Sequence, residues 1–397
     1  MSPTEPSLRV ESILEEATLR AEGADDLGDA ASEAFFMEGL TRLVDSLEQE
    51  GRLNALGRVI ARERVLLHAT NRLLYVRDRA RHPAIAEERI VAPVFIIGMP
   101  RTGTTILHDI LAQDPANRAP LTWETMFPSP PPEAAHFETD PRIERCAATF
   151  PNVEAQIPAF KAMHPMGAEL SQECVTMMGE TMCTALFHNQ FRVPGYQDWV
   201  DHEADLAHVY RFHERQLQHL QWRNARERWV LKTGAHMWGL EHLLRTYPDA
   251  RIVFTHRDPV KTMTSYASLT ALVRSMGSDE VDPLEIAEDW TARIKRVLEH
   301  AIAVREEQSP PNALFYDVIF QDFVSDQFGV VERIYEAFDL PLTGEGADQM
   351  RAFIADNPKG KHGIHRYAPE EFGVRPDAVR EAFRPYLERF GLEPESA

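Results

Sequence analysis

A short apolar run that ends in a glycine-containing loop and leads into a helix constrains this sequence most. Residues 94–97 are continuously apolar, as expected of a strand buried on both faces of a parallel sheet. The loop at residues 98–105 reads Gly-Met-Pro-Arg-Thr-Gly-Thr-Thr, and residues 105–113 then carry apolar side chains at helical spacing. Glycines let a backbone approach an anion closely, and the free amides of a helix N-terminus point at it. The segment therefore predicts a phosphate-binding loop in an α/β fold.

The rest of the chain supports that fold class. Helical periodicity runs through residues 1–90, whose apolar stripes fit either core packing or the contact of a homodimer. Strand-like and helix-like segments then alternate, which predicts a P-loop-like, mainly parallel sheet flanked by helices. The predicted strands are 94–98, 229–232, 251–256 and 313–320, and the predicted helices are 238–247, 260–276 and 286–307. We expect an all-helical N-terminal extension at 1–90 and an α/β domain at 91–397.

Composition narrows the possible partners. The chain has 42 basic and 62 acidic residues, a formal net charge of −20. General nucleic-acid binding is excluded, because it depends on a broad positive surface. The longest apolar runs are too short for a transmembrane segment, and the N-terminus does not resemble a secretory signal. Cys146, Cys174 and Cys183 lack metal-type spacing and are odd in number, so a reducing cytoplasm fits best.

The loop lacks one residue of the nucleotide triphosphatase pattern. Gly103 is followed by Thr104 and Thr105, so the lysine that reaches the β- and γ-phosphates is missing. A cation stands instead at Arg101, whose planar guanidinium can contact two oxygens of a phosphate or sulfate. A loop without that lysine suits a 5′-phosphosulfate, which has no γ-phosphate.

These residues resemble a known family. Residues 100–105 resemble the phosphosulfate-binding loop of sulfotransferases that depend on 3′-phosphoadenosine-5′-phosphosulfate (PAPS). With residues 111–115, Leu-Ala-Gln-Asp-Pro, the loop is similar to that of a bacterial branch with a helical N-terminal extension. The resemblance covers roughly residues 91–390. It implies transfer of a sulfuryl group from PAPS to an acceptor hydroxyl, with adenosine 3′,5′-bisphosphate (PAP) as product and no metal required.

The resemblance also implies where the donor binds. Arg257 ends a predicted strand, and Ser265 lies eight positions later in a helix, as in the family's pair for the 3′-phosphate. A basic, glycine-containing loop at residues 359–366 matches the segment that closes over this phosphate, and Lys361 is our choice within it. The implied donor-binding residues are Arg101, Thr102, Gly103, Thr104, Thr105, Arg257, Ser265 and Lys361.

Arg101 and three other residues are the catalytic candidates. Glu124 lies 23 positions after Arg101, about where several branches place a glutamate base, and the adjacent Trp123 would raise its pKa. Lys232 ends a predicted strand and matches the lysine that the family uses on the leaving or transferring group. His236 lies four positions after Lys232 rather than the two seen in branches with a histidine base, so we assign it to acceptor or sulfuryl contact.

Two other functions remain open. A nucleotide phosphotransferase with a degenerate loop is disfavoured by the missing lysine and by the pair at 257 and 265. A catalytically silent adenosine-phosphate-binding protein is disfavoured by the presence of both Glu124 and Lys232. The segment at about 120–225 is marked by prolines and rich in Met, Phe, Trp and His. This composition predicts a helical lid that covers the acceptor, a small or lipid alcohol. The sequence does not identify that acceptor.

Overall fold

Five parallel strands form the centre of the molecule. The computed structural model describes residues 6–151, 167–308, 314–358 and 368–395. The strand order is β2-β3-β1-β4-β5, and each neighbouring pair is parallel. The strands are β1 Val94–Gly98, β2 Asn117–Arg118, β3 Arg228–Lys232, β4 Arg251–His256 and β5 Phe315–Ile319. The carboxyl ends of such strands meet at one edge, which is where open α/β sheets bind ligands.

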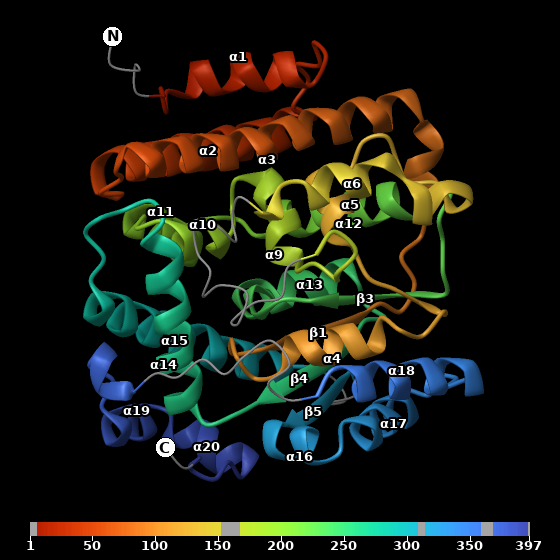
Figure 1. Ribbon diagram of the computed structural model, residues 1–397, viewed down its shortest axis with the longest axis vertical. Coiled ribbons are helices and arrows are strands. Elements are labelled where there is room, and N and C mark those ends of the chain that lie inside the picture. The colour runs from red at the N-terminus through yellow and green to blue at the C-terminus, as the bar shows by residue number, and fades with distance from the viewer. Residues whose placement is uncertain (1–5, 152–166, 309–313, 359–367, 396–397) are drawn as a thin grey trace.

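Helices cover the sheet and extend far beyond it (Figure 1). The N-terminal helices form a layer at one end, a group of shorter helices lies between that layer and β3, and the C-terminal helices lie at the opposite end. The helices are α1 Val10–Arg20, α2 Ala30–Glu50, α3 Ala55–Arg81, α4 Thr104–Leu111, α5 Thr122–Met126, α6 Pro141–Ala147, α9 Cys174–Met177, α10 Ala185–Gln190, α11 Pro194–His202, α12 Ala207–Gln221, α13 Leu240–Thr246, α14 Pro259–Arg274, α15 Pro283–Glu306, α16 Phe320–Ser325, α17 Gln327–Ala337, α18 Gly344–Asp356, α19 Pro376–Ala382 and α20 Arg384–Phe390.

The N-terminal helices are joined to the rest by a shared core. The side chains of Asp29 and Asn54 cap α2 and α3 by accepting from backbone amides one turn later. Arg72 of α3 is buried, and its guanidinium donates to the carbonyl oxygens of Leu27 and Glu180. One continuous cluster of buried apolar side chains extends from α1 to α20. The prediction of an all-helical N-terminal region is confirmed, whereas a domain boundary at residue 90 stays a prediction.

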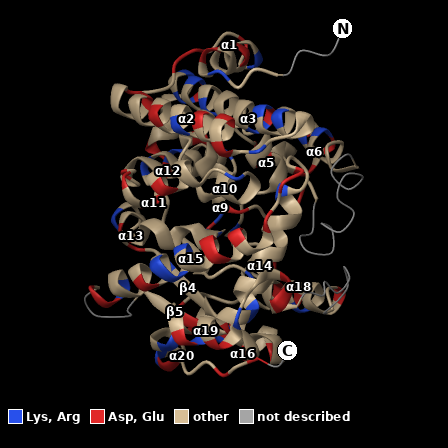
Figure 2. Ribbon diagram, turned by 90° about the vertical axis from the view of Figure 1, so that its left-hand side faces the viewer, with Lys and Arg blue, Asp and Glu red and all other residues tan. Residues whose placement is uncertain are grey.

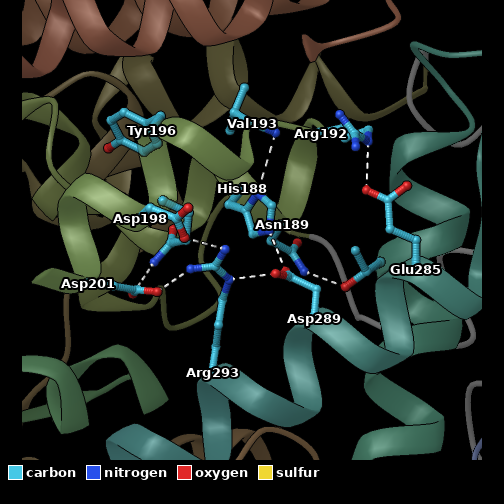
Figure 3. A network of polar contacts seen from close by, with 12 residues as sticks. His188, Asn189, Arg192, Val193, Tyr196, Asp198, Asp201, Glu285, Asp289 and Arg293 are labelled. Carbon is cyan, nitrogen blue, oxygen red and sulfur yellow. Dashed lines mark hydrogen bonds and ion pairs between the residues drawn. The ribbon is translucent and has the colours of Figure 1, made fainter.

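A network of charges fixes α10 and α11 to α15 (Figure 3). Arg293 of α15 donates to Asp198 at 2.8 Å and also to Asp201, both on α11. Its Nε donates to Asp289 at 2.8 Å, and Asp289 accepts from His188 of α10 at 2.7 Å. Because the backbone amide of Val193 donates to His188 Nδ1, the proton of this imidazole lies on Nε2, facing Asp289. These contacts attach part of the segment predicted as a lid to α15.

Two details differ from the sequence prediction. Strand β2 was not predicted, since two residues are too few to show a period. The predicted helix at 238–247 is divided into a 3₁₀ helix, Gly234–Gly239, and α13. Acidic residues predominate along α2 and basic residues along α3 (Figure 2). Among the described helices, none combines the length and the apolarity that crossing a bilayer requires.

Candidate active site

The loop between β1 and α4 is strained in the way that a phosphate-binding loop requires. Gly98 has φ 140°, and a Cβ there would lie 2.4 Å from Thr255 Oγ1. Arg101 adopts φ 68° and Gly103 φ 86°, both in the left-handed region that costs a non-glycine residue about 1 kcal/mol or more. The hydroxyl of Thr102 donates to the Met99 carbonyl at 2.7 Å and lies 2.6 Å from Thr255 Oγ1, so it stabilises the loop from behind. The first amides of α4, which have no partner within the helix, are left facing the space in front.

Residues from three elements meet at this loop. Arg101 Nε donates to Ser265 Oγ of α14 at 3.1 Å. Arg257, which follows β4, donates through Nη1 to the carbonyl oxygen of Arg101 at 2.8 Å. The sequence predicted that Arg101, Arg257 and Ser265 act on one donor, and the structure brings them together.

Arg257 holds an oxyanion from the chain itself. Its Nε and Nη2 donate to the two oxygens of Glu395, at 2.7 and 2.9 Å. The guanidinium carbon also lies 3.9 Å from the centre of the Phe320 ring, which fixes its plane. This bidentate geometry is the one that arginine uses for carboxylate and phosphate alike. The carboxylate of Glu395 thus occupies the two donors of Arg257 that point in one direction.

Lys232 reaches the same loop from the end of β3. The parallel register pairs Ile96 with Lys232, and the lysine side chain is 2% exposed. Its Nζ lies 3.1 Å from Thr105 Oγ1 and 2.5 Å from Oε1 of Glu173, the residue before α9. A buried lysine needs such a partner, because desolvation of an unpaired charge is costly.

Glu124 and His236 lie outside this group. Glu124 is fully buried, and its two oxygens accept from Arg118 at 2.6 and 3.2 Å and from the amide of Leu121 at 3.0 Å. His236 is buried against Phe95, with Nδ1 3.0 Å from the hydroxyl of Tyr210, and burial holds its pKa well below the ordinary value. Like Lys232, neither side chain borders the cavity described below; unlike Lys232, neither forms a hydrogen bond with the loop, so the predicted roles of both would require a rearrangement. Lys361 lies outside the described residues.

Two carboxylates beside Lys232 were not singled out from the sequence. Glu173 and Asp109 both border the cavity in front of the loop. Burial raises the pKa of Asp109 to about 6, opposed by the charge of Lys232 and a hydrogen bond with Ser171. Asp109 lies four positions after Thr105 in α4, hence on the same helix face, and that spacing was a usable signal. Glu173 carries no such signal, because a long segment separates it from the loop.

The cavity in front of the loop has a volume of about 2040 Å³. Sites for small molecules usually measure about 300–1,000 Å³, so this one has room for two substrates. It extends from the loop along α14, past Leu269 and Val273, to α3, where Leu56 and Leu67 border it. Among the described residues, no group of three or more His, Cys, Asp or Glu side chains is arranged to hold a metal ion.

Known proteins share both this sequence and this fold. Residues 93–344 match the model of the sulfotransferase family. The omega-hydroxy-beta-dihydromenaquinone-9 sulfotransferase Stf3 of Mycobacterium tuberculosis and of Mycobacterium bovis is 25% identical over 320 residues, 77% of this chain and 77% of Stf3. The crystal structure of sulfotransferase STF1 from Mycobacterium tuberculosis matches with a TM-score of 0.85 and 30% identity, over 96% of this chain and all of STF1. STF9 from Mycobacterium avium matches with a TM-score of 0.89 and 26% identity, over the whole of both chains. The family match covers well over half of the sequence, and the chain therefore belongs to the sulfotransferase family and is a sulfotransferase.

Proposed function

We propose that this sulfotransferase uses PAPS as its donor and a lipophilic alcohol as its acceptor. The observation that carries the proposal is the meeting of Arg101, Arg257, Ser265 and Lys232 at one loop, which opens into a large cavity with apolar walls. We also keep the cytoplasm as the proposed location, because the three cysteines are buried and free.

Two anion-binding places account for the two phosphate positions of the donor. Arg101, Lys232 and the free amides of α4 surround the place proposed for the 5′-phosphosulfate. Arg257, which the carboxylate of Glu395 already engages, is proposed for the 3′-phosphate with Ser265. When bound, the donor supplies a sulfuryl group, whose S–O bond to the 5′-phosphate breaks as the acceptor oxygen bonds to sulfur.

Glu173 is the base that the geometry favours. Its carboxylate borders the cavity and is 26% exposed, whereas that of Glu124 is buried and held by Arg118. The acceptor hydroxyl loses its proton as the O–S bond forms, and a nearby carboxylate is suited to receive it. Lys232, now paired with Glu173, is placed to stabilise the negative charge that develops on the leaving phosphate.

The proposed acceptor class follows from the walls of the cavity. Leu269 and Val273 of α14 and Leu67 of α3 give it an apolar lining beyond the charged loop. Stf3, whose name specifies omega-hydroxy-beta-dihydromenaquinone-9, acts on a lipophilic hydroxyl compound. A long apolar alcohol suits both observations.

Binding of nucleotides tests the donor. We expect PAP to raise the melting temperature of the protein and ATP with magnesium to leave it unchanged. The variant Glu395→Gln should bind PAP about 3–10-fold more tightly, since a neutral amide competes less well for Arg257. Glu381→Gln, on an exposed carboxylate paired with Arg384, is the control and should bind PAP as the wild type does. Stabilisation by ATP with magnesium but not by PAP would overturn the donor assignment.

A further inference from the structure

Arg64 is a cation at the cavity that has no partner among the residues that the structure describes. It lies on the face of α3 that borders the cavity, one turn after Ile60 and just before Leu67. No described residue forms a hydrogen bond or an ion pair with it. The Arg64 side chain is partly buried, and it borders the cavity. Desolvation lowers the pKa of its guanidinium, and no neighbouring carboxylate opposes this shift.

The neighbouring arginines of α3 show that this arrangement is unusual. Arg58 pairs with Glu48, Arg62 donates to Ser12, Arg72 donates to Leu27, Arg77 pairs with Glu22, and Arg79 donates to Gln218. Arg81 lies exposed at the end of the helix. A partly buried charge without a counter-charge among the described residues favours a ligand that supplies one.

Arg64 lies far from the place where the chemistry is expected. Helix α14 runs from Ser265, beside the loop, towards the start of α3, where Gly277 and Gly57 touch so closely that a Cβ on Gly57 would lie 1.9 Å from the carbonyl oxygen of Gly277. The nine steps from Ser265 to Arg274, where α14 ends, span roughly 14 Å at 1.5 Å per residue. Arg64 lies two turns beyond Gly57 in α3. Figure 1 shows α3 in the layer at one end of the molecule and α4 beside the sheet, with the group of shorter helices between them, so Arg64 and the loop before α4 border the cavity at different places.

We propose that Arg64 binds an oxyanion of the acceptor, and that the acceptor is an amphiphile with its hydroxyl at one end and a carboxylate-type group at the other. This rests on the proposed function, since it assigns the acceptor of that same site. The apolar walls between the loop and α3 hold the chain of the molecule, the loop end receives its hydroxyl, and Arg64 fixes its far end. The enzyme would then prefer an acceptor with a negatively charged end to a neutral acceptor of the same length.

Hydroxy fatty acids of increasing length test the proposal. The probes are ω-hydroxy carboxylic acids of 10 to 18 carbons and their methyl esters, assayed with labelled PAPS. At the best chain length we expect kcat/KM for the acid to exceed that for the ester at least 10-fold. Arg64→Gln should lose this preference, because kcat/KM falls for the acid and stays unchanged for the ester. Arg64→Lys should keep part of the preference. Arg64→Glu should have a higher kcat/KM for 12-amino-1-dodecanol than for the acid. Arg58→Gln, on the same helix but paired outside the cavity, is the matched control and should keep the preference of the wild type.

A binding measurement separates this proposal from the proposed function. Calorimetry on the PAP-bound protein should show tighter binding of dodecanoate than of its methyl ester in the wild type, and no difference in Arg64→Gln. Absence of sulfuryl transfer with this binding preference intact would contradict the proposed function alone. Equal binding of acid and ester by the wild type, or equal losses for both in Arg64→Gln, would overturn the assignment of Arg64.

Discussion

At the scale of single residues, substitution should lower kcat strongly at Glu173 and not at Glu124. Glu173→Gln removes a proton acceptor at the cavity, so kcat of the folded variant should fall about 10²–10⁴-fold. It also leaves the buried Lys232 with a neutral partner, so the free energy of unfolding should fall as well. Glu124→Gln leaves the buried Arg118 with a neutral partner, so the free energy of unfolding should fall by about 3 kcal/mol. Kinetics with labelled PAPS and urea unfolding of both variants give the comparison. A large loss of kcat in folded Glu124→Gln, with Glu173→Gln fully active, would restore Glu124 as the base.

The cationic residues of the site were predictable because strand ends place them. Arg101, Lys232 and Arg257 each follow or end a strand of one parallel sheet, so they meet at one edge whatever the intervening segments do. The carboxylates were not predictable in the same way. The role of Glu124 depends on Arg118, only six positions away but on an element of two residues, and no pattern of spacing reveals that pair.

At the scale of elements, substitution of Arg293 should lower the free energy of unfolding more than substitution of any exposed charged residue of α15. Arg293→Met leaves Asp198, Asp201 and Asp289 without their common counter-charge, and we expect a loss of about 3–5 kcal/mol in the free energy of unfolding. Since α10 lines the cavity, KM for a long-chain alcohol should rise more than KM for PAPS. Urea unfolding and steady-state kinetics measure the two effects.

Lys295→Gln is the matched control for Arg293. It removes an exposed pair with Glu299 on the same helix, which is worth about 0.5 kcal/mol or less. If both variants lost the same small amount of stability, the charge network of Figure 3 would not anchor α10 and α11.

The elements were predictable in proportion to their length and periodicity. Helices such as α2 and α3 repeat their apolar stripe over many turns, and β1 and β4 are uninterrupted apolar runs. The sequence did not show that α3 forms a wall of the cavity, because an apolar stripe looks the same whether it meets a core or a ligand. Arg64 interrupts that stripe, and only the structure shows that no side chain in the described part of the chain compensates its charge.

At the scale of the whole molecule, stability should fall in mild acid. Burial lowers the pKa of His108 to about 4, of His213 to about 3 and of His219 to about 4. The unfolded chain protonates these groups near pH 6.5, so between about pH 6.5 and 4 it binds more protons than the folded chain. Each histidine then removes about 1.4 kcal/mol of stability per pH unit as the pH falls below its unfolded pKa.

Asp109 acts in the opposite direction and does not reverse this trend. Its folded pKa of about 6 lies above the unfolded value of 3.8, so the folded chain keeps a proton between those pH values and gains stability as the pH falls. The raised pKa of Glu214 acts in the same direction as that of Asp109, but the three histidines outnumber these two carboxyls. We therefore expect a net loss of more than about 2 kcal/mol between pH 6.5 and 5 in urea unfolding. His213→Phe should weaken this dependence on pH, because it removes the most strongly shifted of the three. A free energy of unfolding that stays constant from pH 7 to 5 would show that these histidines are not held neutral by the fold.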